Sequence, residues 1–343
     1  MSAETKTTRL PGLMRWLLPV LVSLLAFWFL LRNFDPQGIA TSFQTVSLPA
    51  LLLAILLFLV GLSLRAWCWK IMLGHGFSYK TAFLGLNAGY LMNNVLPLRL
   101  GEFGRAILLS GTGPDRGSFG QVFAAVLSER VLDIFLAALF ALVVLPLLVA
   151  SDSIRVAAIV AFLLALGLMV AAGIGAMHKD KVLAWAEEKV KSSKGWRSKL
   201  VALLGHLLNG FSFFAQPSRW IPAFLLLVLS WVCSMVQLYI LQSQVLQHMA
   251  WWWPVLVVSA GAFINALPSA PAGIGVFEAA TVGAYALIGV GQSPALVLAI
   301  ILHVIQFVIP GLFGLVGITL LGNSLPALFR KSLNLKDGQE QQQ

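Results

Sequence analysis

The sequence predicts an all-α integral membrane protein with six full spans and two re-entrant broken-helix hairpins arranged as an inverted repeat. Hydrophobic residues make up 59% of the 343 residues and charged residues only 10%, whereas a soluble domain carries about 25% charged residues. The apolar runs are long and lack strand-like alternation, so they indicate helices rather than barrel strands. Two similar breaks, separated by about half the chain, interrupt this apolar pattern.

Six apolar runs approach or exceed the roughly 20 residues that a helix needs to cross the hydrocarbon core. They are Leu13–Leu31, Leu48–Trp69, Phe119–Val149, Ile154–Met177, Trp220–Leu241 and Ala295–Leu321. The first run follows basic residues, as a signal peptide does, but no small-residue cleavage site follows it, so we predict an uncleaved span. We therefore expect a membrane domain over residues 13–322, between a cytoplasmic N-terminus at 1–12 and a cytoplasmic tail at 323–343.

Two further apolar segments contain a break. Lys80–Ser110 is interrupted by Asn94-Val95-Leu96-Pro97, and Pro254–Val290 by Asn265-Ala266-Leu267-Pro268. Non-helical backbone survives at membrane depth only where protein or a watery cavity surrounds it. We therefore expect each segment to form two short helices that enter and leave by the same face.

The order of these elements predicts two halves, at about 13–149 and 154–321. Each half contains two spans, one broken hairpin and one further span, and three crossings are an odd number. The second half is therefore expected upside down relative to the first. Inverted repeats with interrupted helices are the sequence signature of secondary transporters, whose site lies near the midplane.

The distribution of positive charge predicts the orientation. With the N-terminus inside, Arg32 and Arg155 are the Lys and Arg residues that fall outside, and the basic loop 178–219 falls inside. Leucines at helical spacing in this loop predict two short helices on the inner membrane surface. The net charge of +10 then indicates contact with anionic lipid headgroups and no nucleic-acid partner.

Ionisable residues inside a membrane are costly and mark a pathway or a binding site. Two groups stand out: Arg99, Glu102 and Arg105 after the first break, and Glu129, Arg130 and Asp133 within the third span. Glu129 and Asp133 share a helix face, and Arg130 is within reach of Asp133. Two interpretations remain open, an ion-pair network that fixes the first hairpin to the third span, and an anion site in which arginines bind phosphate.

Three more polar residues lie at the breaks. Glu278 is expected near the start of the second half-helix of the outer hairpin, where the helix N-terminus favours a carboxylate. It is interpreted either as a helix cap or as a group that meets a cationic headgroup or a coupling proton. Asn94 and Asn265 are expected to satisfy freed backbone groups, with direct ligand contact as the alternative.

Catalytic and metal-binding motifs are absent from the sequence. There is no Walker A loop, no H-E-x-x-H motif and no His/Cys cluster with metal spacing. Cys68 and Cys233 lie in apolar runs and are expected to be buried free thiols. We therefore expect no catalytic residue, no metal site and no cofactor.

Three ordered motifs carry a resemblance to a known family. They are N-N-V-L-P-L-R-L-G-E-F-G-R at Asn93–Arg105, S-E-R-V-L-D at Ser128–Asp133 and L-P-S-A-P-A-G-I-G-V-F-E at Leu267–Glu278. Over roughly Met14–Leu321 the chain resembles the transmembrane domain of lysylphosphatidylglycerol synthase/flippase proteins. The resemblance implies a module in a prokaryotic cytoplasmic (inner) membrane that moves lipids between leaflets. It matches a stand-alone member, because the chain ends at Gln343 without the aminoacyltransferase domain of the bifunctional proteins.

The sequence thus predicts a flippase for a phospholipid or other anionic lipid, whose phosphate is bound by Arg99 and Arg105, with Arg130 as a further candidate. Glu102, Glu129 and Asp133 would hold these arginines. One alternative is a membrane-embedded enzyme acting on a polyprenyl-phosphate-linked sugar, with Asp133 as base. Another is a scaffold that recruits a separate lipid synthase through Lys179–Arg219. The sequence leaves the oligomeric state open.

Overall fold

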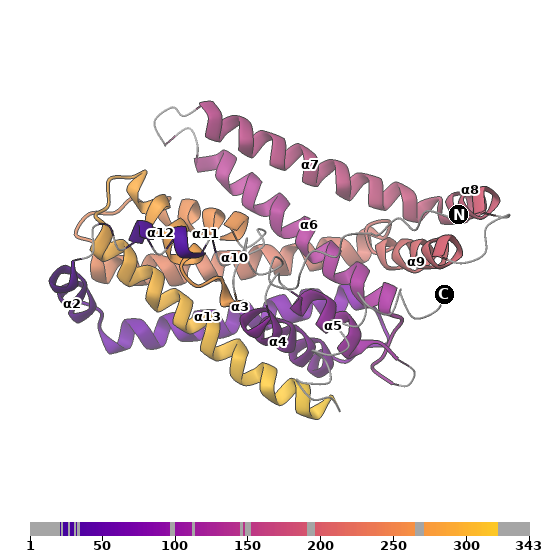
Figure 1. Ribbon diagram of the computed structural model, residues 1–343, viewed down its shortest axis with the longest axis horizontal. Coiled ribbons are helices and arrows are strands. Elements are labelled where there is room, and N and C mark those ends of the chain that lie inside the picture. Colours follow the sequence, from indigo (N-terminus) through magenta and orange to yellow (C-terminus); the bar gives the residue numbers. More distant parts are fainter. Residues whose placement is uncertain are drawn as a thin grey trace, which may run out of the picture.

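The computed structural model describes residues 21, 23–26, 28–30, 32, 35–96, 100–111, 114–144, 147, 152–190, 196–264 and 271–321, and these residues are helical apart from their connections (Figure 1). The longest helices are α3 (Leu48–Leu73), α6 (Phe119–Val144), α7 (Asp152–Met177), α10 (Pro217–Val245) and α13 (Gln292–Leu320). The shorter ones are α2 (Pro36–Gln44), α4 (Tyr79–Val95), α5 (Gly101–Leu109), α8 (Lys179–Val190), α9 (Trp196–Phe211), α11 (Trp253–Ile264), the 3₁₀ turn η3 (Pro271–Gly273) and α12 (Val276–Ala286).

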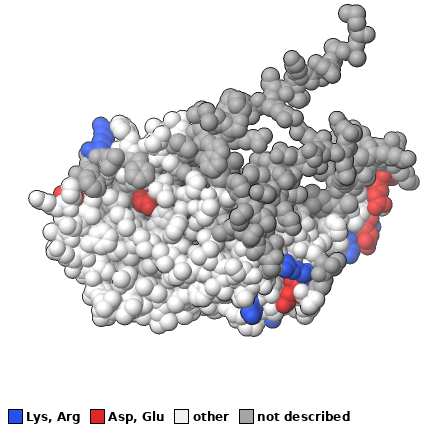
Figure 2. Space-filling view, turned by 60° about the horizontal axis from the view of Figure 1, so that its bottom comes forward, with Lys and Arg blue, Asp and Glu red and all other residues white. Residues whose placement is uncertain are grey.

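Four described helices are long and apolar enough to cross a membrane, which makes the chain a multi-pass membrane protein. They cover Leu48–Leu73, Ile159–Met177, Pro217–Val245 and Gln292–Leu320, and they confirm four of the six predicted spans. The predicted third span forms α6, which has 26 residues but carries three charged residues near its middle. The predicted first span, Leu13–Leu31, lies mostly outside the described residues. In Figure 2 charged side chains gather at the edges of the visible face, which is otherwise uncharged where it is described.

The first break begins as the sequence predicts. Leu96 leaves the helical region and is extended, with φ −97° and ψ 141°, which is the conformation favoured before a proline. The chain then re-enters a helix at Gly101. Here α5 runs antiparallel to α4, because Leu109 packs at Gly85 and the other end of α5 packs at Gly89. A side chain on Gly101 would overlap the carbonyl oxygen of Gly89.

Just after the second predicted break, three residues depart from helical geometry. Ala272, Gly273 and Gly275 have φ angles of 60°, 73° and 83°, which lie in the left-handed region that glycine tolerates and alanine adopts at a cost. These residues turn the chain through η3 into α12. The new helix packs against α11, where the Phe277 ring lies 3.8 Å from the Cβ position of Gly261.

Helix α4 of the first hairpin is held against α13 by close backbone contacts. A methyl group on Gly314 would lie 2.6 Å from the carbonyl oxygen of Asn87, and one on Gly317 would lie 2.6 Å from that of Leu84. Thus α13 packs directly on the backbone of α4. Small residues at such crossings are expected in a membrane, where helices associate through van der Waals packing rather than through the hydrophobic effect.

The basic loop 178–219 forms the two predicted helices, α8 and α9. They lie together at one end of the molecule, beyond the ends of α6 and α7 (Figure 1). The helix α9 also packs on α6, where a side chain at Gly120 would overlap the Cβ atom of His206. The short helix α2, at the opposite end of the molecule, was not predicted; Asp35 caps its N-terminus by accepting a hydrogen bond from the Gln37 amide at 3.2 Å.

Two glycines of α13 provide a matched test of the packing against α4. We expect Gly314→Ala to lower the stability of the purified protein by about 1–3 kcal/mol, because the added methyl group meets rigid backbone and has no space. Gly311→Ala is the control, because nothing lies within 4 Å of its Cβ position. Thermal unfolding in one detergent measures both variants, and equal stability of the two would contradict the close packing.

Candidate functional site

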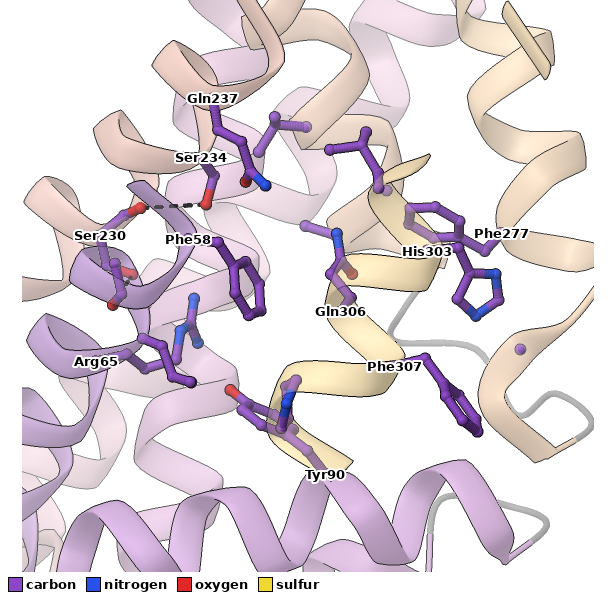
Figure 3. Close-up of a pocket in the computed structure, with 18 of the residues that line it drawn as sticks. Phe58, Arg65, Tyr90, Ser230, Ser234, Gln237, Phe277, His303, Gln306 and Phe307 are labelled. Carbon is purple, nitrogen blue, oxygen red and sulfur yellow. Dashed lines mark hydrogen bonds between the residues drawn. The ribbon is translucent and has the colours of Figure 1, made fainter. Parts of the chain in front are cut away.

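A cavity of about 280 Å³ lies between the two broken hairpins, within the bundle of long helices. Residues from α3, α4, α6, α10, α11, η3, α12 and α13 line it, so both halves of the chain contribute to its wall. In Figure 3 Arg65 and Tyr90 stand on one side, while His303 and Phe277 stand on the other. The cavity therefore has a cationic side and a side that carries the histidine.

The cationic side is built around Asp133 on α6. Its carboxylate accepts hydrogen bonds from Arg65 Nη1 at 2.8 Å and Nη2 at 3.0 Å, and from Trp231 Nε1 at 3.1 Å. The same arginine donates to Glu129 Oε1 at 3.1 Å. The two carboxylates thus share one guanidinium, as their common helix face predicts, and the two parallel bonds to Asp133 fix its plane.

Arg105 on α5 lies behind this wall and does not line the cavity. It is 3% exposed, and its Nη2 donates to Glu129 Oε2 at 2.8 Å. Its guanidinium lies 4.3 Å from the ring centre of Trp69, a cation–π distance. Gly89 makes this position possible, because a methyl group there would lie 3.1 Å from Arg105 Cδ. Arg105 therefore lies behind the cavity wall, and its contact with a phosphate stays a prediction.

Arg130 pairs with Glu102 rather than with Asp133, the partner that the helical spacing suggested. Its Nη2 lies 2.7 Å from Glu102 Oε1, and the two side chains are 26% and 20% exposed. Arg130 lines the cavity beside Arg65 and Asp133. Six charged groups therefore form one cluster: the arginines 65, 105 and 130 and the acids Glu102, Glu129 and Asp133. Their formal charges cancel.

Three buried polar atoms on the cavity wall have no partner among the described residues. They are Asn94 Nδ2, Arg130 Nε and Gln237 Nε2, and all three are N–H donors. Gln237 is only 2% exposed, and a buried donor without an acceptor costs about 1–3 kcal/mol. A ligand that supplies oxygen acceptors would remove this cost.

The opposite wall of the cavity contains an ionisable pair. His303 Nδ1 on α13 contacts Glu278 Oε1, and its Nε2 lies 3.1 Å from the carbonyl oxygen of Ala272. The second oxygen of Glu278 accepts a hydrogen bond from the Gly275 amide at 2.7 Å. Glu278 thus caps α12 as predicted, and it also binds a histidine that the sequence analysis did not assign.

The family model for the lysylphosphatidylglycerol synthase TM region matches residues 16–314. The chain therefore belongs to this family. The match contains every cavity residue, and membership associates the chain with membranes and lipid. No curated protein matches the chain.

The remaining predicted residues of this family member are placed as follows. Among the described residues, it is Asn93 that satisfies freed backbone at the first break, with its Oδ1 accepting from the Gly101 amide at 2.9 Å, and no such bond is seen for Asn94. Arg99 and Asn265 lie outside the described residues. Arg65 was not among the predicted site residues, although an arginine inside the predicted Leu48–Trp69 span is a signal of the same kind as the charged residues in the third span.

The stability of the protein is expected to fall strongly when one member of the charge cluster is removed. Glu129→Gln removes the counter-charge of the buried Arg105, so we expect a loss of roughly 3 kcal/mol, typical of a broken buried ion pair. Glu188→Gln on the exposed face of α8 is the control and should change stability little. The double variant Arg105→Met/Glu129→Gln should recover part of the loss.

Thermal unfolding of the three variants in the same detergent measures these differences. A Glu129→Gln variant as stable as Glu188→Gln would mean that the cluster contributes nothing to the fold.

Proposed function

We propose that this protein is a translocase that moves a phospholipid or other anionic lipid between the two leaflets, and that it is not an enzyme. The observation that carries the proposal is a cavity lined by two arginines and by unpaired N–H donors. Arg65 and Arg130 both line it, and so do Asn94 and Gln237, whose buried N–H donors have no partner among the described residues. A headgroup phosphate supplies oxygen acceptors for these donors and for the exposed N–H groups of the two arginines.

The finer architecture forms part of the proposal: the two hairpins are re-entrant and the halves are inverted repeats. Support comes from helix length, because α5 has 9 residues and α12 has 11, so they span roughly 14 and 17 Å at 1.5 Å per residue. A hydrocarbon core is about 30 Å thick. The antiparallel packing of α5 on α4 also returns the chain towards the side from which it came.

The ion pairs explain how arginines are kept ready for a phosphate inside a membrane. An unpaired charge inside a membrane is expensive, and Arg65 and Arg130 each have a carboxylate partner. Their side chains remain 18% and 26% exposed. In the proposed cycle the phosphate adds bonds to these exposed donors, while the acyl chains stay in the bilayer.

The surroundings of Asp133 disfavour the enzyme alternative. A general base needs a free lone pair directed at its substrate, but this carboxylate already accepts three hydrogen bonds from Arg65 and Trp231. Recruitment of a separate lipid synthase through α8 and α9 stays a prediction that is compatible with translocation.

The charge on the cavity wall gives the first functional test. We expect Arg130→Gln to reduce transfer of an acyl-labelled anionic phospholipid at least tenfold, because a hydrogen bond to a charged group contributes about 1.5–3 kcal/mol. Transfer is measured in proteoliposomes by chemical quenching of the label in the outer leaflet. Arg32→Gln, away from the cavity, is the control and should transfer lipid normally. Undiminished transfer by Arg130→Gln would argue against phosphate binding here.

The unpaired amide gives a second test, which separates a binding role from a structural one. Gln237→Leu removes a buried donor that has no partner, so stability should stay the same or rise while transfer falls about tenfold. Gln242→Leu, on the same helix, is the matched control. It removes a hydrogen bond to Tyr285 of 2.6 Å outside the cavity, so stability should fall while transfer per folded molecule stays near normal. If Gln237→Leu instead lost stability and kept normal transfer, Gln237 would not belong to the lipid-binding site.

A further inference from the structure

His303 lies between two oxygen acceptors. Its Nδ1 contacts a carboxylate oxygen of Glu278, and its Nε2 lies 3.1 Å from the carbonyl oxygen of Ala272. Both side chains of the pair are largely buried, with 13% and 14% exposure. The Phe277 ring, 5.0 Å from the imidazole, covers the pair further.

The two contacts of His303 require two hydrogens. A neutral imidazole carries one N–H, an ionised carboxylate carries none, and a carbonyl oxygen only accepts. One additional proton is therefore needed, either on the second ring nitrogen or on Glu278. Without this proton, two acceptor atoms would face each other in one of the two contacts. The geometry is that of a site for a single proton.

No other ionisable group contacts this pair within the described part of the chain. From α4 the nearest cavity group that titrates is Tyr90, while α3 contributes Arg65 and α6 contributes Arg130 and Asp133 on the opposite wall. Helices α10 and α11 present no ionisable side chain to the cavity. Asp35, before α2, lies near Ser293 at the far end of α13. The proton on the pair is thus shared between His303 and Glu278.

The proton site joins the outer hairpin to α13. Ala272 belongs to η3 and has a φ of 60°, a backbone conformation that costs a non-glycine residue about 1–2 kcal/mol. Glu278 belongs to α12, and His303 is the residue of α13 that contacts both. Ala272, Phe277 and His303 also line the cavity. Loss of the proton therefore loosens one wall of the lipid site.

We propose that His303 and Glu278 bind the proton whose uptake and release drive lipid movement, so that the protein is a proton-coupled translocase. The inference rests on the proposed function and names its co-substrate. In the protonated state the outer hairpin is fixed to α13. Release breaks one N–H or O–H bond, leaves an ionised carboxylate beside a neutral imidazole, and passes the proton to water. Ala272 of η3 then separates from His303 of α13.

Glu278→Gln tests the site because the amide reproduces the protonated arrangement without a removable proton. Its oxygen can accept from the Gly275 amide, and its NH₂ can donate to His303 Nδ1, leaving Nε2–H for Ala272. We expect this variant to fold and to hold the hairpin closed at every pH.

The experiment uses proteoliposomes with an acyl-labelled anionic phospholipid, a pH difference of about one unit and the membrane potential clamped at zero with potassium and valinomycin. If one proton moves with each lipid, the final leaflet ratio of the wild type shifts up to about tenfold. Glu278→Gln should transfer lipid more slowly and show no shift. If the wild type transfers lipid but its final leaflet ratio does not change with the pH difference, the proposed proton coupling is wrong and the proposed translocase function still holds. Transfer no faster than in protein-free vesicles would overturn both.

Hydrogen exchange supplies a readout that does not depend on transport. We expect the peptide that covers residues 271–280 of the wild type to lose protection as the pH rises, after correction for the intrinsic rate, because the contact with α13 is released. Glu278→Gln should keep its protection over the same range. Wild-type protection that is constant with pH would show that the pair does not control the hairpin.

Discussion

Charge neutralisation at membrane depth is the constraint on which the rest of this structure depends. Asp133 on α6 is held by donors from α3 and α10, and Glu129, one turn earlier, is held by donors from α3 and α5. Four helices, α3, α5, α6 and α10, are therefore joined at one point. Because a single missing partner leaves a charge in the hydrocarbon, the first hairpin has one favourable position against α6.

The two walls of the cavity are secured in different ways. The wall formed by α3, α4 and α6 contains several mutually supporting ion pairs, so it is expected to keep its shape. Among the described residues, the wall formed by η3 and α12 has fewer polar links, and the contacts of Glu278 and Ala272 with His303 join it to α13. In the proposed mechanism the rigid wall binds the phosphate, and the wall with the histidine moves. Such a division suits alternating access, in which one part rocks against another around a fixed site.

Much of the fold could be predicted because membrane segments obey a simple rule of length and polarity. The bounds of α3, α10 and α13 differ from the predicted runs by only a few residues, and Leu96-Pro97 marked the first break through local sterics. The site was less predictable, because its pairs join residues far apart: Glu102 meets Arg130, and Glu278 meets His303. Helical spacing suggested the wrong partner for Arg130, because tertiary packing placed Glu102 closer. Arg65 went unrecognised inside an otherwise apolar run, although its polarity alone was a sufficient signal.

The most direct test of the central claim is a cryo-electron microscopy map of the protein in nanodiscs that contain anionic phospholipid. The account predicts headgroup density in the cavity, with the phosphate between Arg65 and Arg130 and its polar substituent towards Gln237, and with the acyl chains leading out to the bilayer. A map in which lipids lie only on the outer surface of the helices, with the cavity free of headgroup density, would contradict it.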